Sequence, residues 1–261
     1  MSSTVGTDER RRPVLKMSNV WVQGVALVMI FGFLVMGFLA YRTYTASMPL
    51  PDKIVSQSSG ETILTKDEIL NGQALYQARG LQQYGSVMGH GAYLGPDYTA
   101  EYLRMSLEKA RELNDENGIP EFVDDAATPE EAVKEEFRAN RYDPETGVLE
   151  WTDNQIAAFE AAKEYYAEYF GPLSSEKGLP SEFITDSQDI NNLTGFFGWT
   201  AWASAAERPG QDYSYTNNWP AEPRVDNGPT ADLVVWSVLS LIALIGGTGL
   251  IFAIYGRWSK S

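Results

Sequence analysis

The sequence predicts a mainly α-helical membrane protein in which two transmembrane helices flank an extracytoplasmic helical domain. Three observations support this fold class. Two long stretches, residues 19–41 and 233–255, are apolar and contain no charged side chain. Basic residues cluster just outside these stretches, and the acidic segment between them contains repeated helix-start motifs.

Both apolar stretches are long enough to cross a bilayer. At about 1.5 Å per residue, each helix covers the roughly 30 Å hydrocarbon layer. We therefore predict transmembrane helices at 19–41 and 232–256. Aromatic side chains flank both, as in the interfacial belt of membrane proteins: Trp21, Tyr41, Tyr44, Trp236, Tyr255 and Trp258.

The basic residues at the two ends predict the orientation in the membrane. Cytoplasmic flanks of membrane helices are enriched in Lys and Arg. We therefore expect residues 1–18 and 257–261 in the cytoplasm and residues 42–231 outside it, at a plasma (inner) membrane. The flanking basic residues are Arg10, Arg11, Arg12, Lys16, Arg257 and Lys260.

The composition excludes several classes of function. The chain has 20 basic and 35 acidic residues, and every acidic residue except Asp8, Glu9 and Asp232 lies in 42–231. Such a surface repels phosphate backbones, so we expect no nucleic-acid partner. The sequence contains no cysteine, which excludes disulfides, zinc–thiolate sites, iron–sulfur clusters and a covalently attached c-type haem.

Helix-start signals predict five helices in the domain. In a capping box, a threonine and a Glu or Gln three residues later each bond the other's backbone. Thr65–Glu68, Thr128–Glu131 and Thr152–Gln155 match this motif. Strand-like alternation is scarce. The predicted helices are 66–78, 98–113, 129–139, 153–170 and 180–193.

Two segments are rich in aromatics and glycine but show little helical pattern. They are Gly80–Tyr98 and Gly195–Pro223, and the second leads into the second span. Large aromatics near a bilayer suggest a surface that packs against a partner. The same residues could equally form the core of a small domain, and composition does not decide between the two.

The residues available for chemistry are few. His90 is the only histidine, so a bis-histidine haem or a three-histidine metal centre cannot be built within this chain. We expect His90 to be a hydrogen-bonded loop residue, with a ligand, proton-relay or interface role as the alternative. Nucleophile-elbow, P-loop and dinucleotide motifs are absent. The carboxylates at 124–125 and 130–136 are expected to be solvated.

The second span carries small residues four positions apart. Ala243 with Gly247, and Gly249 with Ala253, would lie on one helix face and let a neighbouring helix approach closely. We expect Ala243 and Gly247 to face a partner helix.

Three long motifs carry a resemblance to a known family. They are YGSVMGHGAYLGPDYTAEYL (84–103), FFGWTAWASAAERPGQDYSYTNNWPAEPRVDNGPT (196–230) and WSVLSLIALIGGTGLIFAIYGRW (236–258). The sequence resembles the N-terminal third of quinol-dependent nitric oxide reductases, members of the haem–copper oxidase superfamily. The likeness covers nearly the whole chain. Met88 stands where the family usually has Trp.

The resemblance implies a function that this chain shares with other residues. The outer domain would resemble a cytochrome c without its haem, beside a multi-span core that holds haem b and non-haem iron and reduces nitric oxide with electrons from quinol. The helices that bind those groups are not in this sequence. The chain is therefore expected to bind no cofactor alone and to anchor and cap the core, either as a split subunit or as part of a longer protein.

The resemblance also implies site residues. Gly91-Ala92-Tyr93 is similar to a loop that helps hold calcium near the haem propionates in two-subunit nitric oxide reductases. Gly91 and Tyr93 would then approach a calcium ion. Further residues expected at the partner interface are Tyr84, His90, Asp97, Trp199, Trp202, Tyr213, Tyr215 and Trp219.

Two other functions stay open at this point. A nitric oxide dismutase shares this N-terminal architecture and would differ in the iron and quinol ligands of the core. A stand-alone membrane-tethered binding module would need no haem-bearing partner.

Overall fold

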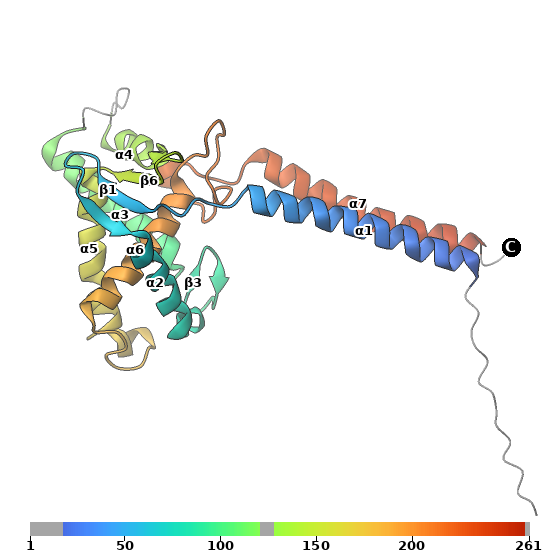
Figure 1. The fold of residues 1–261 in the computed structure, drawn as a ribbon, viewed down its shortest axis with the longest axis horizontal. Coiled ribbons are helices and arrows are strands. Elements are labelled where there is room, and N and C mark those ends of the chain that lie inside the picture. Colours follow the sequence, from blue (N-terminus) through green and yellow to red (C-terminus); the bar gives the residue numbers. More distant parts are fainter. Residues whose placement is uncertain (1–17, 121–127, 259–261) are drawn as a thin grey trace, which may run out of the picture. The chain divides into compact units, whose positions relative to one another are not determined.

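The computed structural model describes residues 18–120 and 128–258 and divides the chain into two compact units, 1–47 and 48–261 (Figure 1). The described part of the first unit contains α1 (Asn19–Thr45), whose N-cap Ser18 accepts a hydrogen bond from the Trp21 amide. Most of both expected cytoplasmic tails, and the carboxylates of Asp124 and Asp125, lie outside the described residues.

Helices α1 and α7 (Ala231–Trp258) are the two candidate membrane spans. Their mean hydropathies are 2.3 and 2.2, and none of their most apolar residues is buried. An apolar helix in the core of a soluble protein would instead be buried, so exposure and composition agree. Both helices extend a few residues beyond the predicted apolar stretches, as the bounds of 19–41 and 232–256 show.

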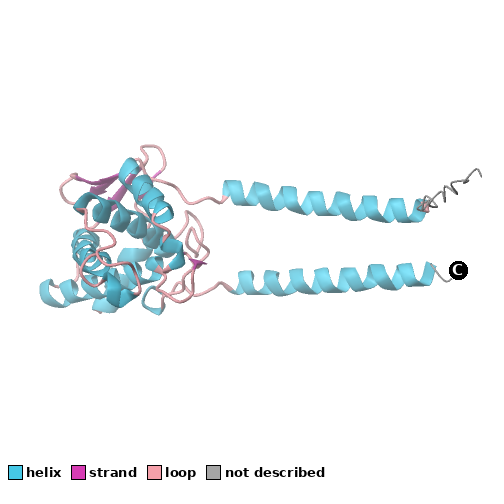
Figure 2. Ribbon diagram, turned by 90° about the horizontal axis from the view of Figure 1, so that it is seen from below, coloured by secondary structure: helices cyan, strands magenta, loops and turns pink. Residues whose placement is uncertain are grey.

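Four of the five predicted domain helices are confirmed, and helices dominate the central domain (Figure 2). The capping boxes at Thr65 and Thr152 form in both directions, and Thr128 caps through its hydroxyl. Asp97 caps the second of these helices. The helices are α2 (Lys66–Ala78), α3 (Tyr98–Asn117), α4 (Pro129–Arg138) and α5 (Asp153–Phe170).

The prediction of a helix at 180–193 is wrong. The observed helix α6 (Ser187–Ala205) starts after the N-cap Asp186 and continues through the aromatic run that carried no helical signal. Nearly the whole of α6 is buried, so its side chains have no polar face and no amphipathic period. A side chain at Gly72 of α2 would overlap the backbone of Asn192, so glycine allows α2 and α6 to cross closely.

A small sheet was not expected from the sequence. It contains β1 (Lys53–Ser56), β2 (Thr62–Thr65), β5 (Tyr142–Asp143) and β6 (Val148–Trp151) in the order β2-β1-β6-β5. β1 is antiparallel to β2 and parallel to β6, while β5 and β6 are antiparallel. Its strands are only two to four residues long, too short to show a period of two.

The shorter elements complete the domain. A second sheet of two strands, β3 (Ser86–Val87) and β4 (His90–Gly91), forms a hairpin. The single-turn 3-10 helices are η1 (Leu81–Gln83), η2 (Ser174–Lys177) and η3 (Pro223–Val225).

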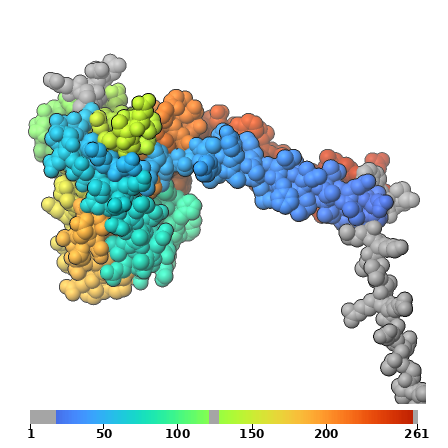
Figure 3. All heavy atoms as spheres, in the orientation of Figure 1, coloured from blue at the N-terminus to red at the C-terminus, as the bar shows by residue number. Residues whose placement is uncertain are grey.

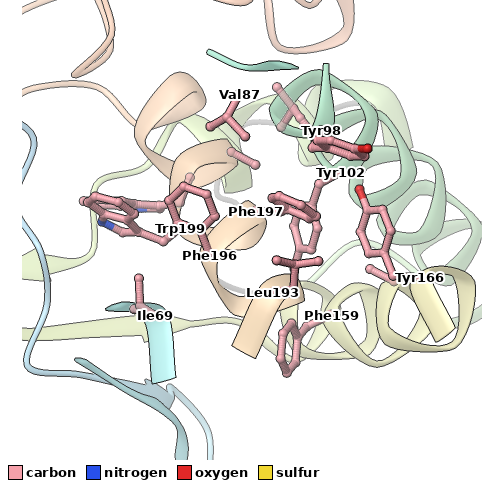
Figure 4. Close-up of a cluster of buried hydrophobic side chains, with 14 of the residues drawn as sticks. Ile69, Val87, Tyr98, Tyr102, Phe159, Tyr166, Leu193, Phe196, Phe197 and Trp199 are labelled. Atoms are coloured by element: carbon pink, nitrogen blue, oxygen red, sulfur yellow. The ribbon is translucent and has the colours of Figure 1, made fainter. Parts of the chain in front are cut away.

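Aromatic side chains from α2, α3, α5 and α6 form the core (Figure 4). The rings of Tyr98 and Phe197 stack at a centroid distance of 4.7 Å and an interplanar angle of 8°. Tyr166 meets both rings edge-on. Offset stacked and edge-on pairs are the favoured geometries of aromatic rings. The first part of the segment Gly195–Pro223 is therefore core rather than surface.

One carboxylate in the acidic helix α4 is not solvated, contrary to expectation. Glu136 is fully buried. Its carboxylate accepts hydrogen bonds from the Thr152 hydroxyl and from Asn154 Nδ2, and Arg141 donates to its backbone carbonyl. Burial raises the pKa of the Glu136 carboxyl, although these hydrogen bonds act in the opposite direction.

Replacing Glu136 with Gln should change how stability depends on pH. Below about pH 4.5, the ordinary value of this group, Glu136 is protonated in both the folded and the unfolded chain. As the pH rises, the unfolded chain loses its proton first, so the wild type loses stability until the raised folded pKa is passed. Gln cannot ionise.

The unfolding free energy of Glu136→Gln relative to wild type should therefore rise between pH 4 and pH 7, by about 1.4 kcal/mol for each unit by which the pKa is raised. Thermal unfolding of the detergent-solubilised chain across this range measures it. A difference that is flat with pH would contradict the assignment.

Candidate functional site

The hairpin of β3 and β4 is closed by a tight turn. Ser86 pairs with Gly91 and Val87 with His90, which leaves Met88 and Gly89 as the two turn residues. Both have positive φ, 50° and 76°, as a two-residue hairpin turn of type I′ requires. The strand pairs are too short to hold this turn alone, so its stability must come from neighbouring side chains.

Asp97 supplies this support. Its Oδ2 accepts hydrogen bonds from Ser86 Oγ at 2.8 Å and from the Gly89 amide at 2.7 Å. Its Oδ1 accepts from the Ala100 amide at 3.0 Å, which caps α3. The carboxylate thus joins the hairpin to the first turn of α3. The structure places Asp97 inside the domain's own hydrogen-bond network, and a partner is not needed to explain it.

The loop after the hairpin is held as closely. The Ala92 amide donates to Gln82 O at 2.8 Å and to Gly85 O at 3.1 Å. Gly91 has φ 146°, and a side chain there would overlap Gly85 O. The backbone of residues 91–95 therefore lies directly on the segment before β3, and glycine is required at this contact.

Three side chains of this rigid segment project into solvent. Tyr93 is 89% exposed and Leu94 is 101% exposed. His90 is also exposed, and its Nδ1 lies 2.9 Å from Met88 O. That contact assigns the proton to Nδ1 and leaves Nε2 as the acceptor in the neutral ring. Leu94 was not among the predicted site residues, because a single exposed leucine carries no sequence signal.

The second segment singled out by the sequence is irregular after α6 but tightly bonded. The guanidinium of Arg138 donates to Glu207 and to the backbone carbonyls of Val225, Asp226 and Asp212. No sequence pattern indicated these bonds, because they join residues 69 to 88 positions apart.

Two asparagines bind the end of the same segment to the domain. Buried Asn227 donates from Nδ2 to Ser204 O and Pro220 O. Asn218 donates from Nδ2 to Gly228 O at 2.8 Å. These bonds fix the chain just before α7.

The structure separates the predicted interface aromatics by burial. Trp199 and Trp202 are only 7% and 6% exposed and belong to the core. Tyr84, Tyr213 and Tyr215 are half-buried. Tyr84 packs against Phe183, and Tyr215 packs against Trp202 at 5.3 Å between ring centroids. For Trp199 and Trp202, therefore, the core interpretation replaces the surface one.

Trp219 is the exception. It is 53% exposed, and its Nε1 would lie 2.7 Å from a side-chain carbon added at Gly89. The two segments singled out by the sequence therefore meet where the Trp219 indole covers Gly89.

The remaining predicted residues lie on α7 or near the predicted cation. Ala243 and Gly247 are exposed on α7, and open space surrounds the Cα of Gly247 among the described residues. No group of three or more His, Asp or Glu in the described ranges could hold a metal ion. Gly91 and Tyr93 alone offer too few oxygen ligands for calcium, so their calcium role stays a prediction.

Comparison with known families decides the assignment. A family model described as the cytochrome c-like domain of the nitric oxide reductase NorB matches residues 51–221. The chain belongs to this family. The match runs from just before β1 to just before η3 and includes the hairpin and Trp219. A search of curated proteins finds no match.

The residues of this nitric oxide reductase domain do not fit a c-type haem. The sequence has no cysteine to attach one, and its single histidine is exposed on the hairpin. Within the described core, stacked aromatic rings occupy the space between α3, α5 and α6. The cavity bounded by Tyr102, Trp151 and Trp202 has a volume of about 20 Å³, which is room for one water molecule.

Replacing Asp97 with Ala should loosen the hairpin. The variant leaves the Gly89 and Ala100 amides without their acceptor and should lower the unfolding free energy by about 1–3 kcal/mol. Hydrogen exchange at the Gly89 amide should become faster at the same time.

The matched control is Asp186→Ala. Asp186 caps α6 by accepting from the amides of Gln188 and Asp189, so its loss should cost a similar amount without affecting Gly89. Equal protection of Gly89 in Asp97→Ala and wild type would refute the role given to Asp97.

Proposed function

We propose that this chain is the N-terminal portion, or a split subunit, of a quinol-dependent nitric oxide reductase, and that it anchors and caps a catalytic core carried by other residues. The observation that supports this most directly is the family match over residues 51–221, between two candidate membrane spans. The reaction of the whole enzyme is 2 NO + 2 e⁻ + 2 H⁺ → N₂O + H₂O.

In this proposal the chain itself is not catalytic. Two b-type haems and a non-haem iron need several histidine or carboxylate ligands. One histidine and no cysteine are available in the 261 residues. Haem b, iron and the quinol site therefore belong to a multi-span membrane core, either a separate chain or other residues of the same polypeptide.

The proposal places the domain outside the cytoplasm. Both termini would lie in the cytoplasm, in line with the basic residues that flank the two spans. The domain would then cover the outer surface of the core, where Gly91 and Tyr93 could complete a calcium site with oxygen atoms of the core.

Affinity purification of the chain from its host in mild detergent tests this function. We expect haem b and nitric oxide consumption to co-purify with it, and we expect the chain expressed alone to show no Soret band. A Soret band in the isolated chain, or a purified native protein without haem, would contradict the proposal.

Replacing Gly247 with Leu tests contact between α7 and the core. Small residues at 243 and 247 allow close helix approach, and a leucine would separate the helices. We expect haem b retained per chain to fall severalfold. Ile245→Phe adds bulk roughly 200° around the helix and should leave the haem content unchanged. Equal haem loss in both variants would argue against a specific face.

A further inference from the structure

We propose that the tip of the β3–β4 hairpin is the docking element of this domain, and that it seats on an uncharged, apolar surface of the membrane-embedded reductase core. The tip patch consists of His90, Tyr93, Leu94 and Trp219. This inference rests on the proposed function and deepens it by naming the contact. The hairpin lies at the surface of the domain, blue-green in Figure 3.

The tip patch exposes apolar side chains on a backbone that cannot relax. Among the described residues outside α1 and α7, Tyr93 and Leu94 are the most exposed large hydrophobic side chains. Their loop is held by the Ala92 amide bonds and the close contact at Gly91, and the hairpin before it by Asp97. A rigid apolar tip gives up little conformational entropy on binding, which favours its use as an anchor.

Hydrogen bonds place the tip patch near the start of α7. Trp219 covers Gly89 of the hairpin. Its neighbour Asn218 is bonded to Gly228 O at 2.8 Å, and α7 begins at Ala231, three residues further on. Three residues of extended chain span at most about 11 Å. The patch is therefore tethered close to the point where the chain enters its membrane span.

Charge favours a protein surface over lipid headgroups as the occupant. None of the four side chains is Lys, Arg, Asp or Glu, and the chain as a whole carries a net charge of −15. Binding to anionic headgroups needs clustered Lys and Arg. The tip patch instead offers two apolar anchors, with His90 Nε2 as an acceptor and the hydroxyl of Tyr93 at its edge, which suits a mainly apolar interface with a few hydrogen bonds.

Spin labelling tests the docking directly. The sequence has no cysteine, so Leu94→Cys provides the only thiol of this chain for a nitroxide. We compare the chain alone in nanodiscs with the haem-containing protein, and measure collisions with oxygen and with a water-soluble nickel complex. Leu70→Cys on α2 is the control, because Leu70 is 40% exposed and lies outside the patch.

The outcomes are distinct. Docking on protein predicts that the label at position 94 is open to nickel in the isolated chain and shielded from both reagents in the haem-containing protein, at least about fivefold, while position 70 does not change. Shielding from nickel with high oxygen collision would indicate lipid and overturn the proposal, as would an open label in both samples. Failure to obtain any haem-containing protein would refute the proposed function itself.

A second variant pair gives an independent readout. Leu94→Asp should lower the temperature at which the haem-containing protein loses its Soret band, because a charge would be buried at the contact. Leu70→Asp should have no such effect. The two variants should unfold at equal temperatures as isolated chains. Equal haem loss in both would refute docking at the tip.

Discussion

The stacked contact between Tyr98 and Phe197 is the interaction on which the rest of this domain depends. Tyr98 is the first residue of α3, and Phe197 lies in the middle of α6. The stack fixes the start of α3 inside the core, next to the buried hydrogen bond between Thr99 and Thr200 at 3.0 Å. Because Asp97 directly precedes Tyr98, the same contact positions the carboxylate that holds the hairpin.

The surface loops are therefore ordered by the core rather than by their own backbone pattern. Met88 donates its amide to Thr99 Oγ1, the same hydroxyl that meets Thr200. The Trp219 segment is fixed in a similar way by Arg138, Asn218 and Asn227, whose bonds replace a regular backbone ladder. Irregular backbone that is fully bonded can present side chains as precisely placed as those of a helix or strand.

This arrangement suits a domain that has the cytochrome c-like family relationship without the residues for a haem. Aromatic rings fill the interior and stabilise the domain through burial and ring geometry. The chemistry proposed for the whole reductase is then located in a membrane core, and this chain contributes anchoring, coverage and a fixed contact surface.

Features that depend on neighbouring residues could be predicted from the sequence. Capping boxes at Thr65 and Thr152 correctly predicted the starts of α2 and α5, because a cap acts within one turn. The apolar runs predicted α1 and α7, and the single histidine with no cysteine limited the chemistry available to the chain.

Features that depend on distant residues emerged only from the folded domain. The extent of α6, the four-stranded sheet, the burial of Trp199 and Glu136, and the exposure of Leu94 were all missed or left open. A fully buried helix loses its amphipathic period, and short strands pair through residues far apart in the chain. Whether an aromatic side chain faces the core or the solvent depends on the elements packed around it, which no local pattern records.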